Sequence, residues 1–483
     1  MQLATIIRIL GVLLMLFSFT MLAPFAVSLW YGDSAMTAFG AAYLLILISG
    51  FILWLPFRGH RRELRVRDGF LIVVLFWTVL GASGAVPLML ADNPGMSLTD
   101  AMFESISGLT TTGATVITGI DSLPKSILFY RQQLQWMGGM GIIVLAVAIL
   151  PMLGIGGMQL YRAETPGPMK DSKLTARISE TAKTLWYIYV WLTVACALAY
   201  WLAGMDLFDA ICHSFSTIAI GGFSTHDASM GYFDSALIDY IAIFFMVVAG
   251  VNFSLHFVTF RSVSLGHYWR DPELKTYLMI LGATSALVIG ALSFTNVYDG
   301  EMDTFRHALF QTVSMATTTG FATQNFSAWP IYLPALLIFV SFVGGCAGST
   351  GGGMKVIRIL LLFKQGMREI RRLIHPNGVF LIKIGGSPLP DRILEAVWGF
   401  FAAYVLLFAI MMVMLMATGL DQVTSFSAVA AALNNLGPGL GSVAAHYGEI
   451  NDFSKWILSF AMLMGRLEIF TLLVLFTPTF WKS

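Results

Sequence analysis

Apolar stretches long enough to cross the ~30 Å hydrocarbon core of a bilayer recur along the whole chain. Ten are predicted, at 6–29, 36–57, 68–91, 126–153, 184–204, 236–260, 274–295, 331–363, 393–419 and 455–480. An even number of spans places both termini on one side of the membrane. The first stretch, which contains Arg8, is similar to a signal peptide, but its length and the span that follows at once indicate a retained helix.

The composition agrees with this pattern. Of the 483 residues, 57% are hydrophobic and 11% are charged, whereas soluble proteins have about 25% charged residues. The mean hydropathy is +0.77, and single soluble cores stop growing near ~250–300 residues. The chain is therefore predicted to be an all-α polytopic membrane protein.

Lys and Arg are distributed unevenly between the two sides of the membrane. Alternating the ten spans puts 23 of the 28 on one side, which the positive-inside rule identifies as the cytoplasm, so both termini are expected there. Sixteen of the 27 acidic residues lie on the outer side, where they either concentrate cations at an entrance or are indifferent to sidedness. The net charge of +1, without a basic block, argues against a nucleic-acid partner.

Four segments between spans share one pattern, a short helical run followed by a Thr/Gly-rich turn. They read DAMFESISGLTTTGAT (100–115), DAICHSFSTIAIGGFST (209–225), HALFQTVSMATTTGFAT (307–323) and SFSAVAAALNNLGPGLG (425–441). Alignment on one glycine matches Gly113, Gly222, Gly320 and Gly437, and six residues earlier it matches Ser107, Ser216, Ser314 and Ala431. The period is about 100 residues, which indicates a repeated supersecondary unit.

These repeats predict four pseudo-symmetric helix–re-entrant loop–helix units around one pore, preceded by two extra N-terminal helices. The expected boundaries are 1–60 for the two extra helices, then 61–175, 176–268, 269–385 and 386–483 for the four units, of which the third contains a broken inner helix.

The turns have the composition of a cation path. Irregular backbone at membrane depth is tolerated only where it is buried in protein or lines a watery cavity. Glycine allows positive φ, so successive carbonyls can point the same way and form rings that replace an ion's hydration shell. The helix C-terminal ends favour a cation, and the absence of Asp and Glu from the turns favours a monovalent one over calcium. A helix cap is the better explanation of a single turn, but four copies at one period favour the pore.

The predicted span 331–363 is interrupted by GGCAGSTGGG, residues 344–353. Glycine costs roughly 0.5–1 kcal/mol per residue in a helix interior, so we expect a loop at mid-membrane, where broken helices form binding sites and gates. Close packing of small residues is the alternative. A phosphate-binding loop is excluded because Met354 precedes Lys355 and Val356 stands where Ser or Thr is required.

Two sets of basic residues add to this picture. Arg466 lies near the middle of 455–480 and is expected to face water or oxygen ligands beside a cation path. A structural ion pair is the alternative, although Glu468, two residues away, is expected on another face. Lys364, Arg368 and Arg372 form a basic stripe that either docks a cytosolic regulator or anchors the helix by the positive-inside rule.

The segments GLTTTGAT, AIGGFST, ATTTGFAT and NNLGPGLG, with GGCAGSTGGGMK at 344–355 and the Arg466 region, resemble the Trk/Ktr/HKT superfamily of potassium transporters, closest to its bacterial Trk-type branch. The resemblance covers nearly the whole chain. It implies uptake of potassium across the bacterial cytoplasmic (inner) membrane and a homodimer with one pore per protomer. It also implies a cytosolic regulatory ring that binds nucleotides, with no nucleotide bound by this chain itself.

The resemblance also implies which residues bind the ion and which form the gate. The selectivity filter would comprise Thr111, Thr112, Gly113, Ile220, Gly221, Gly222, Thr318, Thr319, Gly320, Asn435, Leu436 and Gly437. The gate would comprise Gly345, Cys346, Ala347, Gly348, Ser349, Thr350, Gly351, Gly352, Gly353 and Arg466. Every turn departs from the TVGYG of tetrameric channels, which implies a shorter filter with looser selectivity over sodium.

Three function classes can be compared on sequence grounds. A conducting pore gated at the glycine loop fits best, because the repeats all run the same way, whereas inverted repeats would support an alternating-access carrier. The sequence shows no nucleophile–base pair or metal constellation that would indicate an enzyme, and Cys196, Cys212 and Cys346 have no metal or disulfide spacing. Passive flow and coupling to protons or sodium both stay open.

Overall fold

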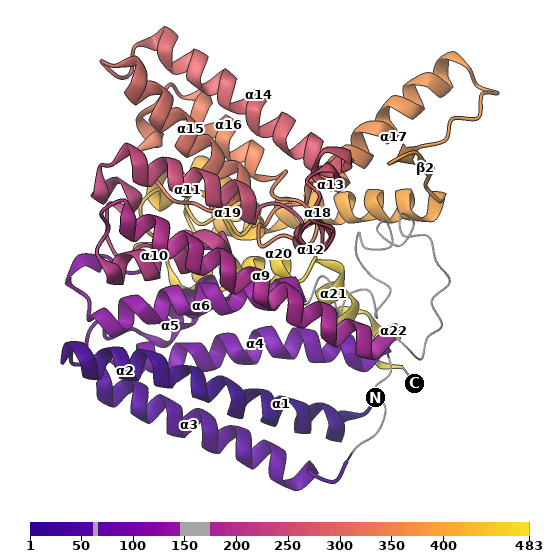
Figure 1. The fold of residues 1–483 in the computed structure, drawn as a ribbon. Helices are drawn as coiled ribbons and strands as arrows, with labels where there is room; N and C mark the ends of the chain where they lie inside the picture. Colours follow the sequence, from indigo (N-terminus) through magenta and orange to yellow (C-terminus); the bar gives the residue numbers. More distant parts are fainter. Residues whose placement is uncertain (61–65, 145–173, 483) are drawn as a thin grey trace.

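The computed structural model describes residues 1–60, 66–144 and 174–482, and helices dominate this part of the chain (Figure 1). Six of the described helices are long and apolar enough to cross a membrane, or up to eight spans if each of two sharply bent pairs counts as one. The prediction of an all-α polytopic membrane protein is confirmed. The end of the predicted span 126–153 lies outside the described residues, as do six of the basic residues counted above, namely Arg61, Arg62, Arg65, Arg162, Lys170 and Lys173.

Two N-terminal helical segments precede the repeated part of the fold. Helix α1 (Leu3–Ser18) continues through a short 3-10 turn into α2 (Leu22–Tyr31), and α3 (Met36–Trp54) returns beside them. A Cβ on Gly11 would lie 2.7 Å from the Gly50 carbonyl oxygen, so the absence of side chains lets α1 and α3 approach closely. Figure 1 shows these helices in indigo along one edge of the molecule, next to α4.

The described remainder of the chain contains four units, each with a short central helix between two flanking helices. The central helix is called the pore helix here, after the sequence-based prediction. The pore helices of units one to four are α5 (Leu98–Leu109), α10 (Leu207–Ala219), α15 (Glu301–Thr317) and α19 (Gln422–Leu433). The preceding helices are α4 (Val66–Leu90), α9 (Leu174–Leu202), α14 (Pro272–Thr295) and α18 (Asp391–Ala417). The following inner helices are α6 (Lys125–Val144), α11 (Ala236–Ala249), α16 (Tyr332–Ser341) and α20 (Asp452–Arg466). Ser97, Asp206 and Asp421 cap the first, second and fourth pore helices through side-chain hydrogen bonds to backbone N–H groups.

Three inner helices are broken, of which the sequence predicted one. Between α16 and α17 (Val356–Ile374) the chain leaves the helix, as expected. The prediction of continuous spans over 236–260 and 455–480 was wrong, because the chain bends by 91° between α11 and α12 (Phe253–Ser262) and by 109° after α20. Asn252 starts α12 as a new cap, and Glu468 and Ile469 adopt left-handed φ values of 55° and 48° before α21 (Phe470–Leu473). Arg466 is therefore the last residue of α20 and not a mid-helix residue.

The remaining elements are short. Strands β1 (Lys383–Ile384) and β2 (Ser387–Pro388) form an antiparallel hairpin with Lys383 opposite Pro388, which the sequence analysis missed. In Figure 1 the hairpin and α17 project from the body of the molecule. The other short elements are α13 (Gly266–Arg270), α22 (Pro478–Trp481) and the 3-10 turns Phe19–Met21, Leu55–Phe57, Ile120–Ser122, Ser229–Phe233, Phe326–Ala328, Gly441–Val443 and Val474–Phe476.

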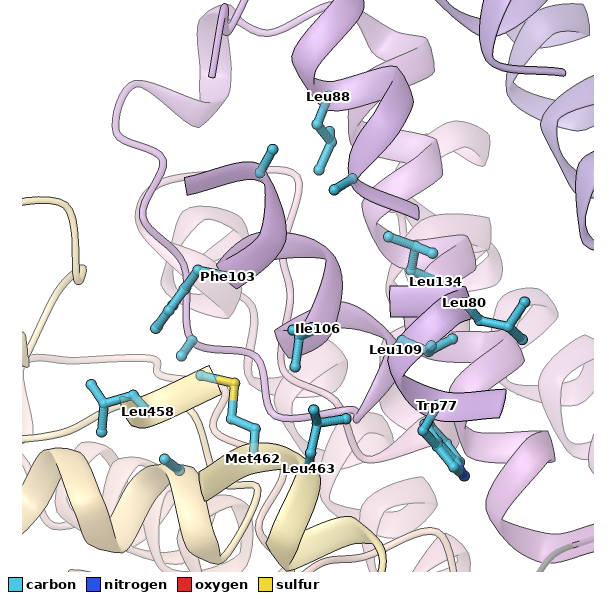
Figure 2. Packing of buried hydrophobic residues seen from close by; sticks show 14 of the residues in the cluster. Trp77, Leu80, Leu88, Phe103, Ile106, Leu109, Leu134, Leu458, Met462 and Leu463 are labelled. Carbon is cyan, nitrogen blue, oxygen red and sulfur yellow. The ribbon is translucent and has the colours of Figure 1, made fainter. Parts of the chain in front are cut away.

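The hydrophobic core joins the last unit to the first. Figure 2 shows the pore helix α5, with Phe103 and Ile106, between α4 and α20. The labelled residues from its neighbours are Trp77, Leu80 and Leu88 of α4, Leu134 of α6, and Leu458, Met462 and Leu463 of α20. Because α20 belongs to unit four and α5 to unit one, this packing closes the four units into a circle.

Ion pairs reinforce the contacts between successive units. Arg306 at the start of α15 donates to Asp239 of α11 at 2.6 Å, and Lys455 of α20 donates to Asp100 of α5 at 2.7 Å. Each pair connects an inner helix to the pore helix of the next unit. Both termini meet at the start of α4, where Gln2 N donates to Asp68 (3.0 Å) and Arg67 donates to the Lys482 carbonyl (2.6 Å).

A histidine joins the loops that follow the turns of units one and two. His226 contacts Asp121 through Nδ1 (2.5 Å) and Asp209 through Nε2 (3.3 Å), and its ring stacks on Tyr232 with centroids 3.4 Å apart. Burial would lower the pKa of His226, but the hydrogen bonds and charges of Asp209 and Asp121 outweigh burial, so its pKa is raised above 6.5. Burial would raise the pKa of Asp121, but the hydrogen bonds from His226 and Asp227 outweigh it and lower that pKa.

This cluster predicts a pH-dependent contribution to stability. Because the folded-state pKa of His226 is raised, the cluster stabilises fully below the ordinary pKa of about 6.5 and its contribution is lost as pH rises through the folded-state value. We expect His226→Gln to lower the melting temperature of the purified protein at pH 6, with a gap to the parent that shrinks toward pH 9. His375→Gln, which changes an exposed histidine after α17, is the control and should match the parent. A gap for His226→Gln that stays constant over this pH range would contradict the assignment.

Candidate functional site

The four Thr/Gly turns have the same backbone hydrogen bonds. The N–H of the residue before each aligned glycine (Gly113, Gly222, Gly320 and Gly437) donates to the carbonyl five residues back, at 2.8 Å in every unit. The pairs are Thr112 to Ser107, Gly221 to Ser216, Thr319 to Ser314 and Leu436 to Ala431. One residue earlier, Thr111, Ile220, Thr318 and Asn435 all have left-handed φ, from 52° to 68°. Each turn is thus a Schellman-type helix cap, which agrees with the alignment made from the sequence.

The aligned glycines bring the four turns together in a closed ring. A Cβ built on Gly113 would overlap the carbonyl oxygen of Gly221, and one on Gly222 would overlap that of Thr319. In the same way Gly320 meets the Leu436 carbonyl, and a Cβ on Gly437 would lie 2.6 Å from the Thr112 carbonyl oxygen. The contacts run in chain order and return from unit four to unit one. All twelve predicted filter residues therefore lie in one assembly, here called the carbonyl ring.

The ring presents backbone oxygens that are free to bind a ligand. Among the described residues, no donor reaches the carbonyls of Thr112, Thr319 or Leu436, and none reaches the carbonyls of Thr111, Ile220, Thr318 or Asn435. Gly221 differs, because Gln135 Nε2 donates to its carbonyl at 2.5 Å. Carbonyl oxygens without donors, at four equivalent places, suit a cation that has lost its water.

Polar side chains tie the segment after each aligned glycine back to its own pore helix. Glu104 accepts from Thr115 Oγ1 and from Val116 N at 3.0 Å, and Arg131 donates to Glu104 at 2.8 Å. In the other units the matching contacts are His213 to Ser224 (2.9 Å), His307 to Thr323 (3.0 Å) and Ser427 to Leu440 N (2.8 Å). Sequence reasoning missed these residues, although polar residues such as Glu104 and His213 within short apolar helices were a signal.

A wide cavity lies on one side of the carbonyl ring. It has a volume of about 830 Å³, and all four aligned glycines and the loops that follow them line it. Asp227 is the one carboxylate among its described lining residues. Most of the acidic residues that the sequence assigned to the outer side therefore do not line this cavity.

The glycine-rich loop lies against the other side of the ring. Between Ser341 and Val356 the chain is irregular, as expected from the glycines. Gly352 N donates to Thr318 Oγ1 at 2.7 Å, and Gly353 N donates to the Asn434 carbonyl at 3.0 Å. Thr350 Oγ1 donates to the Ile218 carbonyl at 2.9 Å. A Cβ on Gly352 would overlap the Asn434 carbonyl oxygen, so only glycine permits this approach.

Two other parts of the chain anchor the glycine-rich loop, namely the bend between α11 and α12 and the helix α14. Cys346 N donates to the Gly250 carbonyl at 2.9 Å, and Phe253 N donates to the Gly348 carbonyl at 3.1 Å. Glu273 accepts from Ala347 N at 2.7 Å and from Ile357 N at 3.2 Å. The bend between α11 and α12, which the sequence did not predict, therefore provides backbone groups that anchor the loop.

Arg466 connects the loop to the carbonyl ring. Its guanidinium is 5% exposed and donates to Thr111 Oγ1 at 2.5 Å, to the Thr350 carbonyl at 2.8 Å and to the Gly351 carbonyl at 3.5 Å. The prediction of oxygen ligands is confirmed. Arg466 has no ion-pair partner in the described part of the chain, and Glu468 pairs instead with Arg358 at 2.6 Å.

The basic residues after the loop are partly paired. Lys355, which sequence counting placed among the cytoplasmic cations, is instead next to the loop and donates to the Gly351 carbonyl. Lys364 donates to the Lys383 carbonyl of the hairpin at 2.6 Å, and Arg368 pairs with Asp391 at 3.2 Å. The stripe predicted on α17 thus also fastens the hairpin and the start of α18.

Comparison with known proteins agrees with this geometry. The family described as "TrkH: Cation transport protein" matches residues 35–483. The Trk system potassium uptake proteins TrkH of Vibrio parahaemolyticus and of Escherichia coli K12 are 62% and 60% identical, and each comparison covers 100% of both chains. The Trk system potassium uptake protein TrkG of E. coli is 43% identical over 98% of this chain and 97% of its own.

A solved structure supports the same relationship. The crystal structure of the potassium transporter TrkH from V. parahaemolyticus matches with a TM-score of 0.93 at 60% identity, covering 100% of both chains. These relatives are named as transporters, which confirms the expectation that the chain is not an enzyme. The chain belongs to the TrkH family of cation transport proteins.

Proposed function

We propose that this protein takes up potassium across the bacterial cytoplasmic membrane through the carbonyl ring. The observation that carries the proposal is the closure of the ring in chain order, which sets four equivalent backbone carbonyls around one axis. The relatives named as potassium uptake proteins, identical at about 60% over their full length, support potassium as the ion. Carbonyl oxygens without carboxylates suit a monovalent cation better than calcium.

The loop of residues 345–353 and Arg466 form the gate in this proposal. The loop contacts ring residues or their pore helices in units two, three and four directly, and Arg466 extends the contact to Thr111 of unit one. In this position the loop blocks the path from the ring to the cytoplasm. The guanidinium adds a fixed positive charge that raises the barrier for a cation.

Partners and sidedness follow from the same proposal. Without Lys355, which lies beside the loop, the sequence assigns 22 of the 28 Lys and Arg to the side of both termini. That side would be the cytoplasm, and the 830 Å³ cavity would face outward. A cytosolic ring subunit that binds nucleotides would grip α17 and the hairpin, which project from the body (Figure 1), and would move the loop. The transporter would be a homodimer with one pore in each protomer, and the chain itself would bind no nucleotide.

Substitution of Gly113 by Ser tests the filter. The added Cβ overlaps the Gly221 carbonyl and the φ of 82° is strained for a non-glycine residue, a cost of about 1–2 kcal/mol. We expect potassium over sodium discrimination in proteoliposome uptake to fall by about tenfold. Gly290→Ser, at a glycine of α14 whose Cβ would meet nothing within 4 Å, is the matched control. If a folded Gly113→Ser protein discriminated between potassium and sodium as the parent does, the ring would not be the selectivity filter.

Substitution of Arg466 by Ala tests the charge in the gate. Loss of the cation should raise basal potassium uptake several-fold. The melting temperature should fall because three buried hydrogen bonds are lost, but less than for a variant that leaves a carboxylate unpaired. Arg358→Ala is the comparison, since it strands Glu468 and should lower the melting temperature without raising uptake. A stability loss for Arg466→Ala without increased uptake would make Arg466 a structural residue.

Deletion of residues 346–352 tests the loop. Without it the ring opens directly toward the cytoplasm, so potassium flux should be high and should no longer respond to nucleotide or to the regulatory subunit. The measurement is flux into proteoliposomes with and without the regulator, after gel filtration and melting curves have shown that the variant is folded. A folded deletion variant whose flux still follows the regulator would contradict the gate assignment.

A further inference from the structure

One of the four ring positions is built differently from the other three. In units one, three and four the residue before the aligned glycine carries its own side chain, as Thr112, Thr319 or Leu436. In unit two that residue is Gly221. A Cβ on Gly221 would meet three atoms of Gln135 first, all from its carboxamide, with Oε1 at 2.5 Å and Nε2 at 2.8 Å. The Gln135 side chain, which belongs to α6 of unit one, thus fills the space that the missing side chain leaves.

Gln135 also binds the backbone of the ring from both sides of Gly222. Its Nε2 donates to the Gly221 carbonyl at 2.5 Å, and its Oε1 accepts from Phe223 N at 3.1 Å. The side chain is 0% exposed. A single carboxamide therefore bridges the backbone on either side of Gly222. This turn has two adjacent glycines, Gly221 and Gly222, and so carries fewer side chains of its own than the turns of units one and three.

Because of this contact, the ring carbonyl of unit two already accepts a hydrogen bond from the protein. The ring carbonyls of Thr112, Thr319 and Leu436 accept no hydrogen bond from the described residues, whereas that of Gly221 does. An N–H donor on a carbonyl competes with a bound cation for its lone pairs and fixes its direction. Neighbouring residues of α6 strengthen the attachment, since Gln132 Oε1 accepts from Ser216 Oγ and Arg131 donates to the Ser224 carbonyl at 3.1 Å.

We propose that Gln135 is a specificity-determining residue, which holds the Gly221 carbonyl at the radius suited to potassium and prevents the Gly221–Gly222 segment from closing around the smaller sodium ion. The proposal rests on the proposed filter function of the ring. Gln135 lies in the inner helix α6, outside the four Thr/Gly turns, so the turn motif alone does not reveal this role. At the residue before each aligned glycine the ring is consequently asymmetric, because the Gly221 carbonyl accepts a hydrogen bond and the Thr112, Thr319 and Leu436 carbonyls accept none from the described residues.

The test compares two buried glutamines of the same helix. Gln135→Met keeps the volume and removes the donor. Gln133→Met is the matched control, because Gln133 is also buried but donates to the Thr20 carbonyl of the N-terminal helices at 2.9 Å. Gln135→Met loses two hydrogen bonds and Gln133→Met loses one, so both melting temperatures should fall, that of Gln135→Met further. In proteoliposomes of full-length protein, only Gln135→Met should lose potassium over sodium discrimination, by about two- to tenfold, which corresponds to the loss of one hydrogen bond.

A second pair of variants keeps the proposal testable if Gln135→Met folds poorly. Gly221→Ala alone places a methyl group on the Gln135 carboxamide and should reduce the yield of folded protein. Gly221 has no left-handed φ, so the backbone accepts alanine, and Gln135→Ala combined with Gly221→Ala should restore folding. The double variant should remain less selective than the parent because the donor is absent. A double variant no better folded than Gly221→Ala, or one with parental selectivity, would overturn the proposal.

Parallel measurement of Gly113→Ser separates this inference from the filter itself. If Gly113→Ser alters discrimination and Gln135→Met does not, the role of Gln135 is wrong and the filter stands. If neither variant alters discrimination, the filter assignment fails, and the role of Gln135 fails with it. Loss of discrimination in both variants, with a parental value in Gln133→Met, is the result that the proposal expects.

Discussion

Close backbone contact at the four aligned glycines is the constraint on which the rest of this structure depends. Each glycine abuts a carbonyl of the next unit, and Cβ atoms at Gly113, Gly222 and Gly320 would overlap that oxygen. The turns are irregular backbone deep within a membrane protein, which is tolerated only where protein covers it or water reaches it. The structure meets this requirement with Schellman-type caps, side-chain ties such as Glu104 to Thr115, and ion pairs such as Asp239 to Arg306 between units.

Local sequence signals were sufficient for the parts of this fold that repeat. The Thr/Gly turns, their pore helices and the glycine-rich break have strong compositional signatures, and the alignment on Gly113 and its equivalents matches hydrogen bonds of equal length in all four units. The bends after α11 and α20 were not predicted, because both lie within long apolar stretches and the few polar residues at them, such as Asn252 and Glu468, do not by themselves indicate a break. The contact of Gln135 with the Gly221 carbonyl could not be predicted either, because the two residues are 86 positions apart in the sequence.

Hydrogen bonds join the carbonyl ring to the proposed gate, so in the proposed function the two do not act independently. Thr318 contributes a carbonyl to the ring and accepts a hydrogen bond from Gly352 through its hydroxyl. Arg466 binds Thr111 on the ring and Thr350 on the loop with the same nitrogen. Movement of the loop away from the axis must break these bonds, which changes the support of the ring in units one and three. We therefore expect the open and closed states to differ in ion selectivity as well as in conductance.

In the proposed function, a monovalent cation sits among the four ring carbonyls. Crystals of the purified protein grown in thallium, a heavy substitute for potassium, test it directly through anomalous scattering. We expect an anomalous peak on the axis of the ring that weakens when potassium competes. It should lie within coordination distance of the carbonyl oxygens of Thr112, Gly221, Thr319 and Leu436. A thallium peak elsewhere along the protein with none inside the ring would contradict it.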